Sequence, residues 1–284
     1  MAEGKTLIDV ATLAQGLPDP GCVLLDCRFD LARPGWGEQA FGAGHIPGAQ
    51  YAHLDRDLSS PVTPTSGRHP LPAPEDLARR AGAWGIDEGS DVVVYDQGNG
   101  MYAARAWWLL RWIGVQRVAL LDGGLAAWIA AGHPLDTGTA SAPPRSLQPR
   151  PDATRLVDAT GLSQELAAGT VRLVDARGAD RYAGQNETID PVAGHVPGAV
   201  NHPFTRNLGP DGRLLPPDLL RAAWQATLGP RAPREMVAMC GSGVSACLNL
   251  LAMEQAGLGG ARLYAGSWSE WIRDPSRPVT TGAD

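Results

Sequence analysis

One cysteine in the second half of the chain stands where a nucleophile would be expected. The apolar run Met236–Met239 leads directly into Cys240-Gly-Ser-Gly-Val-Ser-Ala246, and a helical pattern follows. Glycines permit tight backbone angles in such a loop, and the free N–H groups at a helix start favour a thiolate over a thiol. The spacing therefore predicts that Cys240 is a reactive anion, held together with its substrate in a backbone cradle formed by Gly241, Gly243, Val244 and Ser245.

The corresponding loop in the first half has no thiol. It reads Asp96-Gln-Gly-Asn-Gly-Met-Tyr102, with an aspartate where the second half has its cysteine. Because a carboxylate does not carry a transferable sulfur atom, only the second half is expected to be active. The remaining cysteines form no Cys-x-x-Cys pair and no zinc spacing, so we expect neither a disulfide scaffold nor a metal, and we interpret three of them as packing residues: Cys22, Cys27 and Cys247.

The two halves repeat each other. Leu24-Leu-Asp-Cys-Arg28 returns as Leu173-Val-Asp-Ala-Arg177, and Ala43-Gly-His-Ile-Pro-Gly-Ala49 returns as Ala193-Gly-His-Val-Pro-Gly-Ala199, each about 150 residues later. The repetition indicates duplication of one domain. The residues that recur in both halves, including the half without the thiol, are therefore interpreted as structural: His45, His195, Arg28 and Arg177.

A stretch rich in Pro, Ser and Thr lies between the copies and reads as an extended linker. We therefore predict a first domain at residues 1–137 without an active-site cysteine, a linker at 138–153 and a catalytic domain at 154–284. Short apolar runs alternate with helical patterns in each copy, which predicts an α/β fold: two mainly parallel sheets with helices on both faces. The clearest strands are expected at 23–26, 91–95, 117–121, 171–175 and 235–239, and the clearest helices at 103–112 and 245–255.

Composition restricts the class of protein further. The chain has 284 residues, a formal net charge of −6, 44% hydrophobic and 19% charged residues, which is typical of a soluble globular protein. No basic excess is present to bind nucleic acid or an anionic membrane, and no apolar run approaches the roughly 18 residues needed to span a bilayer. We therefore expect a cytoplasmic monomer without nucleic-acid or membrane partners.

Taken in order, these motifs resemble the tandem-domain rhodanese family, and the cysteine loop is similar to that of its 3-mercaptopyruvate sulfurtransferases. The resemblance implies that Cys240 takes sulfur from a small donor, becomes a persulfide and releases pyruvate. It then passes the sulfur to a thiol acceptor such as thioredoxin, or to cyanide, and a persulfide on the chain needs no metal or organic cofactor. Thiosulfate-preferring relatives usually place Arg and Lys directly after the cysteine, whereas this chain has Gly241 and Ser242.

The same resemblance implies roles for residues outside the loop. Ser242 matches a serine that delivers a proton to the leaving enolate, supported by His69 and by an acid. Asp55 is the best match for this acid, and Asp57, two residues later, is the alternative. Arg181 matches an arginine that binds the donor's carboxylate. The family often has a second arginine between this one and the Gly-His-Val-Pro-Gly segment, but residues 182–194 contain no Arg or Lys. The choice between 3-mercaptopyruvate and thiosulfate therefore stays open.

Three interpretations from other classes of protein compete with a rhodanese-like sulfurtransferase. Both loops fit the pattern Gly-x-Gly-x-x-Ala after a strand, as in dinucleotide-binding proteins, but they follow a late strand and the second copy lacks the acid that would bind a ribose. A cysteine phosphatase needs an arginine six residues after its cysteine, where this chain has Ala246. A non-enzymatic persulfide carrier or scaffold would use the same loop, and the sequence alone does not distinguish it from an enzyme.

Overall fold

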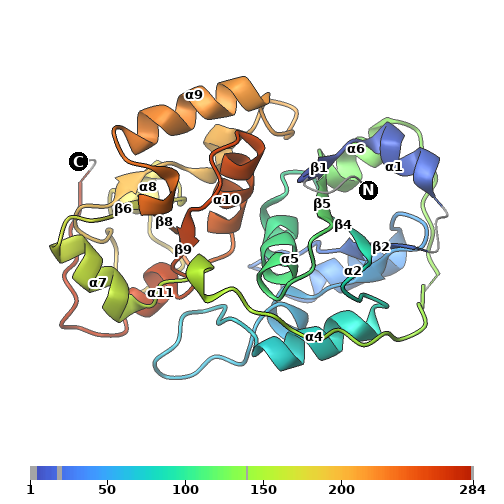
Figure 1. Ribbon diagram of the computed structural model, residues 1–284, viewed down its shortest axis with the longest axis horizontal. Helices are drawn as coiled ribbons and strands as arrows, with labels where there is room; N and C mark the ends of the chain where they lie inside the picture. Colours follow the sequence, from blue (N-terminus) through green and yellow to red (C-terminus); the bar gives the residue numbers. More distant parts are fainter. Residues whose placement is uncertain (1–4, 18–20, 139, 283–284) are drawn as a thin grey trace. The chain divides into compact units, whose positions relative to one another are not determined.

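The protein divides into two compact units, each completed by a short segment from the other half of the sequence. The computed structural model describes residues 5–17, 21–138 and 140–282 (Figure 1). Unit 1 comprises residues 1–60, 71–152 and 210–214, and unit 2 comprises residues 61–70, 153–209 and 215–284. His69 therefore belongs to unit 2 although it lies in the first half of the chain.

Unit 1 contains a parallel five-stranded sheet in the order β1-β5-β4-β2-β3. Its strands are β1 (Leu7–Ile8), β2 (Cys22–Asp26), β3 (Gln50–Tyr51), β4 (Asp91–Tyr95) and β5 (Val118–Leu121). Its helices are α1 (Val10–Gly16), α2 (Trp36–Ala43), α3 (Leu54–Asp57), α4 (Pro74–Ala83), α5 (Met101–Trp112) and α6 (Gly124–Ala130).

Helices cover both faces of this sheet. The side chains of each strand alternate between the two faces, so apolar residues are needed on both. Leu24, Val93 and Tyr95 pack on one face against residues of α1, α2 and α6. Val92 and Val94 point to the opposite face, and α5 contacts β4 and β5. The strands are therefore apolar throughout rather than alternating, as expected for a sheet that is buried on both sides.

Unit 2 has the same design with four parallel strands in the order β7-β6-β8-β9. The strands are β6 (Arg172–Asp175), β7 (Val200–Asn201), β8 (Met236–Met239) and β9 (Arg262–Leu263). The α-helices are α7 (Ala159–Ala167), α8 (Ala179–Tyr182), α9 (Pro217–Leu228), α10 (Ala246–Gln255) and α11 (Ser267–Trp271), and the 3₁₀ helices are η1 (Ala153–Arg155), η2 (Phe204–Asn207) and η3 (Pro233–Glu235). The predicted α/β fold with two parallel sheets is confirmed.

The two units also share local signals that start their helices. Asp9 caps α1 by accepting a hydrogen bond from the N–H of Thr12 at 2.8 Å, and Asp158 caps α7 by accepting one from Gly161 at 2.7 Å. Helices α4 and α9 each begin with proline, whose missing N–H costs nothing in the first turn. These repeated caps are the local counterpart of the duplication seen in the sequence.

The expected linker follows the surface of unit 1. Arg145 donates its backbone N–H to Gly82, and Arg150 donates to Ile113, at 2.9 and 2.8 Å. Residues 140–152 form no helix or strand, in agreement with the extended conformation predicted for this segment. Its limits of 138 and 153 stay a prediction.

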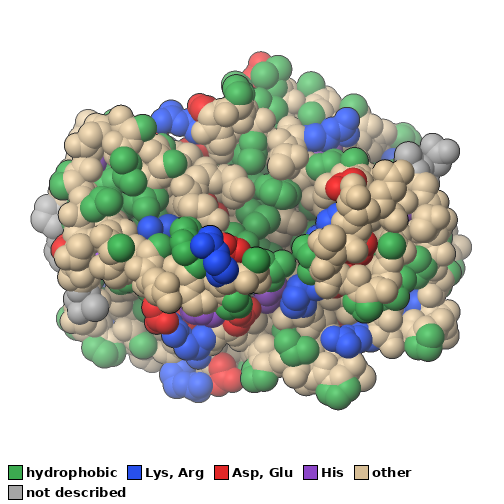
Figure 2. Space-filling model, turned by 180° about the vertical axis from the view of Figure 1, so that it is seen from behind, with side chains coloured by type: hydrophobic (Ala, Val, Ile, Leu, Met, Phe, Trp, Pro, Cys, Tyr) green, Lys and Arg blue, Asp and Glu red, His purple; other side chains and the backbone are tan. Residues whose placement is uncertain are grey.

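Basic and acidic side chains are interspersed on the face that Figure 2 shows. No helix in the described part of the chain has the length and hydropathy needed to cross a bilayer.

Candidate active site

Cys240 lies directly after β8, at the carboxyl end of a central strand and before the start of α10. Ligands of parallel α/β sheets bind at this edge. The turn that redirects the chain from strand to helix depends on Gly243, whose φ is +75°. A β-carbon at position 243 would lie 2.3 Å from the carbonyl oxygen of Ala265. Only glycine fits this turn without moving the backbone that surrounds the thiol.

The loop surrounds the sulfur with backbone donors. The N–H of Gly243 donates to Sγ of Cys240 at 3.2 Å, and the cysteine side chain is buried, with its residue 2% exposed. The backbone N–H groups of the buried residues Gly241, Ser242, Val244 and Ser245 have no hydrogen-bond acceptor within the part of the chain that the structure describes. Buried N–H groups without an acceptor are rare in native proteins. The loop is therefore suited to bind an anion formed on, or attacked by, the sulfur.

Residues of helix α11 fix the backbone of this loop by hydrogen bonds. Ser267 accepts the backbone N–H of Cys240 on its Oγ at 3.1 Å. The N–H groups of Trp268 and Ser269 donate to the carbonyl oxygens of Cys240 and Gly241 at 3.0 and 2.9 Å. These bonds direct the carbonyls of the first two loop residues away from the sulfur, so that its surroundings are formed by donors rather than acceptors.

The equivalent loop in unit 1 also surrounds a side chain with backbone donors. The carboxylate of Asp96, at the position of Cys240, accepts the backbone N–H groups of Gly98, Gly100, Tyr102 and Ala103 at 2.9, 3.0, 2.9 and 3.3 Å. Burial raises the pKa of Asp96, and these four hydrogen bonds oppose that effect. Unit 1 thus fills its own cradle with the Asp96 carboxyl group. Unit 2 has a thiol in the place of that group. Of the corresponding N–H groups, those of Ser242 and Val244 have no acceptor among the described residues, whereas that of Cys247 donates to Val244 at 3.0 Å.

The structure brings two of the expected relay residues together. Nδ1 of His69 lies 2.7 Å from Oγ of Ser242, and the two residues are 4% and 6% exposed. Their hydrogen bond joins residues that are 173 positions apart in the sequence. Asp55 lies in the first turn of α3 in unit 1, where its backbone N–H donates to His53 Nδ1. Its part in a relay stays a prediction.

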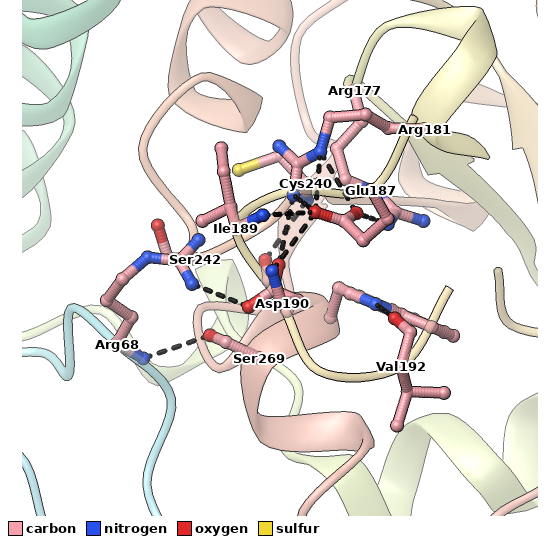
Figure 3. Close-up of polar contacts among 12 residues, drawn as sticks. Arg68, Arg177, Arg181, Glu187, Ile189, Asp190, Val192, Cys240, Ser242 and Ser269 are labelled. Atoms are coloured by element: carbon pink, nitrogen blue, oxygen red, sulfur yellow. Dashed lines mark hydrogen bonds and ion pairs between the residues drawn. The ribbon is translucent and has the colours of Figure 1, made fainter. Parts of the chain in front are cut away.

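Arg181, the expected carboxylate-binding residue, lies in α8 beside two buried acids. Its Nε and Nη2 donate to Glu187 at 3.0 Å, and Nη2 also donates to Asp190 at 3.0 Å (Figure 3). Burial alone would raise the pKa of Glu187, but the hydrogen bonds from Arg181 and two backbone N–H groups outweigh burial and hold it below its ordinary value. Nη1 of Arg181 has no partner among the described residues.

The structure brings a second arginine, Arg68, to this site, and the sequence did not predict it. Arg68 precedes His69, and its Nη1 donates to Oδ1 of Asp190 at 2.5 Å. A β-carbon at position 241 would lie 3.1 Å from Nη2 of Arg68 and 3.7 Å from both terminal nitrogens of Arg181. One signal was available in the sequence: residues 182–194 lack a basic residue but contain two acids that need cationic partners.

The residues repeated in both halves make the same contacts in both units. His45 and His195 each bond a carbonyl oxygen through Nδ1 at 2.8 Å and stack on an aromatic ring. Arg28 and Arg177 each pair with the aspartate that ends the preceding strand, at 2.7 Å. These contacts agree with the structural interpretation of all four residues.

This fold and this site together define a class: duplicated α/β proteins in which one unit carries a cysteine in a backbone cradle. Residues 9–131 and 158–274 match the rhodanese-like domain. A Pseudomonas aeruginosa protein named "probable 3-mercaptopyruvate sulfurtransferase" is 52% identical over 278 residues, covering 97% of this chain and 98% of that one. The chain belongs to the rhodanese family.

Two further relatives bear on the choice of donor. A Mycobacterium tuberculosis protein, named as a thiosulfate sulfurtransferase, is 40% identical and covers 99% of each chain. An Escherichia coli crystal structure, described as the rhodanese fold of 3-mercaptopyruvate sulfotransferases, aligns with a TM-score of 0.80 and 32% identity over 94% of this chain and all of that one. The names of similar proteins thus include both donors that the sequence left open.

Proposed function

We propose that the chain is a sulfurtransferase that moves sulfur from 3-mercaptopyruvate through a persulfide on Cys240 to a thiol acceptor or to cyanide. The observation that supports this most directly is the cradle around Cys240, whose unit 1 counterpart holds the Asp96 carboxylate. Backbone donors that bind a carboxylate in one unit are suited to a thiolate and a terminal persulfide in the other.

In the first half-reaction the Cys240 thiolate attacks the donor sulfur. The sulfur–sulfur bond forms as the carbon–sulfur bond breaks, and the electron pair of the broken bond becomes the enolate of pyruvate. Protonation of the enolate carbon completes pyruvate. In the second half-reaction an acceptor thiolate or cyanide attacks the outer sulfur and returns Cys240 to its thiolate, so no metal or organic cofactor takes part.

Ser242 and His69 supply the proton in this proposal. Ser242 follows Cys240 by two residues, and its hydroxyl contacts His69 Nδ1 at 2.7 Å. The hydroxyl gives its proton to the enolate carbon, and the imidazole restores it through this hydrogen bond. Arg181 binds the donor's carboxylate through its unpaired Nη1, and the backbone of Gly241, Gly243, Val244 and Ser245 surrounds the reacting sulfur.

Thiosulfate is the second candidate donor, because the two guanidinium groups near Gly241 could also hold a dianion and a relative is named for that donor. A non-enzymatic persulfide carrier is the candidate from another class. A cytoplasmic location, a monomeric state and thioredoxin as acceptor stay predictions from the sequence.

One experiment separates these candidates. The protein is incubated with 3-mercaptopyruvate or with thiosulfate, its intact mass is measured and pyruvate is assayed. We expect a gain of one sulfur atom on the peptide that contains Cys240, and pyruvate release in the first reaction. Cys240→Ser should show neither, whereas the control Cys22→Ser, which removes a half-buried thiol in unit 1, should retain both. A wild-type protein that gains no sulfur from either donor would refute the proposal.

A further inference from the structure

A cavity of about 510 Å³ lies in unit 2, between the edge strand β7 and helix α9. Its walls come from β6, β7, η2 and α9, and the side chains that matter below are Arg172, Val200, His202, Arg206, Ala223 and Thr227. The volume lies within the range of about 300 to 1,000 Å³ that is usual for small-molecule sites. None of its described lining residues belongs to the Cys240 loop, so this cavity is separate from the candidate active site.

Two arginines give this cavity its charge. No acid is among the described residues that line it. Neither Arg172 nor Arg206 has a hydrogen bond or an ion pair from its guanidinium group within the described part of the chain, and Nε of Arg172 is buried. Arg262, which also begins a strand, pairs with Glu165 instead. A partly buried cation without an anion is costly, because it has given up water without gaining a counter-charge.

The pleat of the sheet brings Arg172 to this place. Leu173 packs in the core on one face of β6 together with residues of α7 and α11. Because side chains alternate along a strand, Arg172 lies on the opposite face, which it shares with Val174 and with Val200, the partner of Val174 in β7. A β-carbon at position 229, directly after α9, would lie 3.7 Å from Nη2 of Arg172. The end of α9 carries only about half a negative elementary charge, so the two arginines keep the cavity positive.

His202 and Thr227 form a neutral wall beside the arginines. Oγ1 of Thr227 donates to the carbonyl oxygen of Ala223 at 3.1 Å and lies 2.8 Å from Nδ1 of His202, whose ring stacks on Trp224. Burial and the positive charge of Arg206 lower the pKa of His202 to about 4. The imidazole is therefore uncharged at neutral pH, and the positive charge offered to a ligand comes from the two arginines.

We propose that this cavity binds a phosphate group, free or as part of a small phosphate ester, between Arg172 and Arg206. Two unpaired guanidinium groups match the charge of a dianion, and their planar forks match pairs of its oxygens. Val200 and Ala223 provide an apolar surface for the organic part of an ester. The proposal goes beyond sulfur transfer, because binding here needs neither Cys240 nor a sulfur donor.

Inorganic phosphate is the first ligand to test, titrated at constant ionic strength with chloride as the control anion. The NMR signal of the Arg172 side-chain Nε–H, assigned by its absence from Arg172→Gln, reports binding at this cavity rather than at Cys240. We expect the signal to shift saturably with phosphate and not with chloride. Arg206→Gln should raise the Kd for phosphate about tenfold, near the lower end for a hydrogen bond between charged groups because Arg206 is exposed.

Arg234→Gln is the matched control, because it removes an exposed arginine of η3 that is not among the described residues lining the cavity. Phenyl phosphate then separates the two sources of the phosphate group. A Kd well below that of inorganic phosphate assigns the site to esters, and an equal Kd assigns it to the free ion. A signal that does not shift with phosphate, or a Kd in Arg206→Gln equal to that in Arg234→Gln, would overturn the proposal. No sulfur donor is present, so neither result bears on the proposed sulfur transfer.

Discussion

Replacing Ser242 with alanine tests whether the hydroxyl does chemistry or only lines the loop. The Oγ atom lies 2.7 Å from His69 Nδ1, and both residues are more than nine-tenths buried. Bulk water therefore has little access to replace the hydroxyl as proton donor. General acid catalysis by a positioned side chain typically contributes 10²- to 10⁴-fold. We expect Ser242→Ala to lower kcat for 3-mercaptopyruvate about 100-fold, which corresponds to about 3 kcal/mol in the activation free energy.

Thiosulfate provides the internal comparison in the same protein. Its leaving group, sulfite, departs as an anion and needs no proton on carbon, so the loss with this donor should stay within about threefold. Pyruvate release is followed for the first donor and thiocyanate formation, with cyanide as acceptor, for the second. The matched control is Ser163→Ala, whose hydroxyl donates to the carbonyl oxygen of Ala159 in its own helix, α7, at 2.8 Å.

A double-mutant cycle then tests the pair. His69→Asn should produce a loss similar to that of Ser242→Ala, and the double variant should be hardly worse than either single one, because residues that act as one unit are not additive. Equal losses with both donors, or fully additive losses in the cycle, would refute the relay and leave Ser242 as a structural residue of the loop.

Two further predictions concern the loop and its unit. Gly243→Ala forces a β-carbon to 2.3 Å from the Ala265 carbonyl oxygen at a φ of +75°. Persulfide formation should therefore fall at least about tenfold with both donors, while the midpoint of thermal unfolding shifts only by a few degrees. Wild-type rates of persulfide formation would contradict this account of the turn. Burial lowers the pKa of His202 from 6.5 to about 4. Between these pH values the unfolded state therefore binds more protons than the folded state. The stability that comes from keeping His202 neutral is complete above pH 6.5 and is lost as the pH falls toward 4. Between pH 7.5 and 4.5, the unfolding free energy of the wild type should therefore fall by up to about 3 kcal/mol relative to that of His202→Phe. Urea denaturation at each pH measures both values. Phenylalanine keeps the stacking on Trp224, whose ring centroid lies 4.0 Å from that of His202, and a pH-independent difference would exclude His202 as the cause.

The predicted elements agree with the structure wherever local rules decide them. The expected strands at 91–95 and 171–175 and the expected helix at 245–255 correspond to β4, β6 and α10 within one residue at each end. Apolar runs of four or five residues that are bounded by turn residues, and helices that end at glycine, specify these elements from short stretches of chain. The duplication doubled this information, since each expected strand could be checked against its copy.

The sequence alone determined the parts of the site that are contiguous: Cys240, its glycines and the serine two residues later stand in one strand–loop–helix unit whose backbone geometry follows from residue types. Only the tertiary structure decided which distant groups meet that loop. It placed residues 61–70 in the second unit, bringing His69 to Ser242 and Arg68 to Gly241. It also showed that Asp190 contacts both Arg181, nine residues earlier, and Arg68, 122 residues earlier. Such contacts depend on how whole elements pack, because no local propensity connects residues so far apart in the chain.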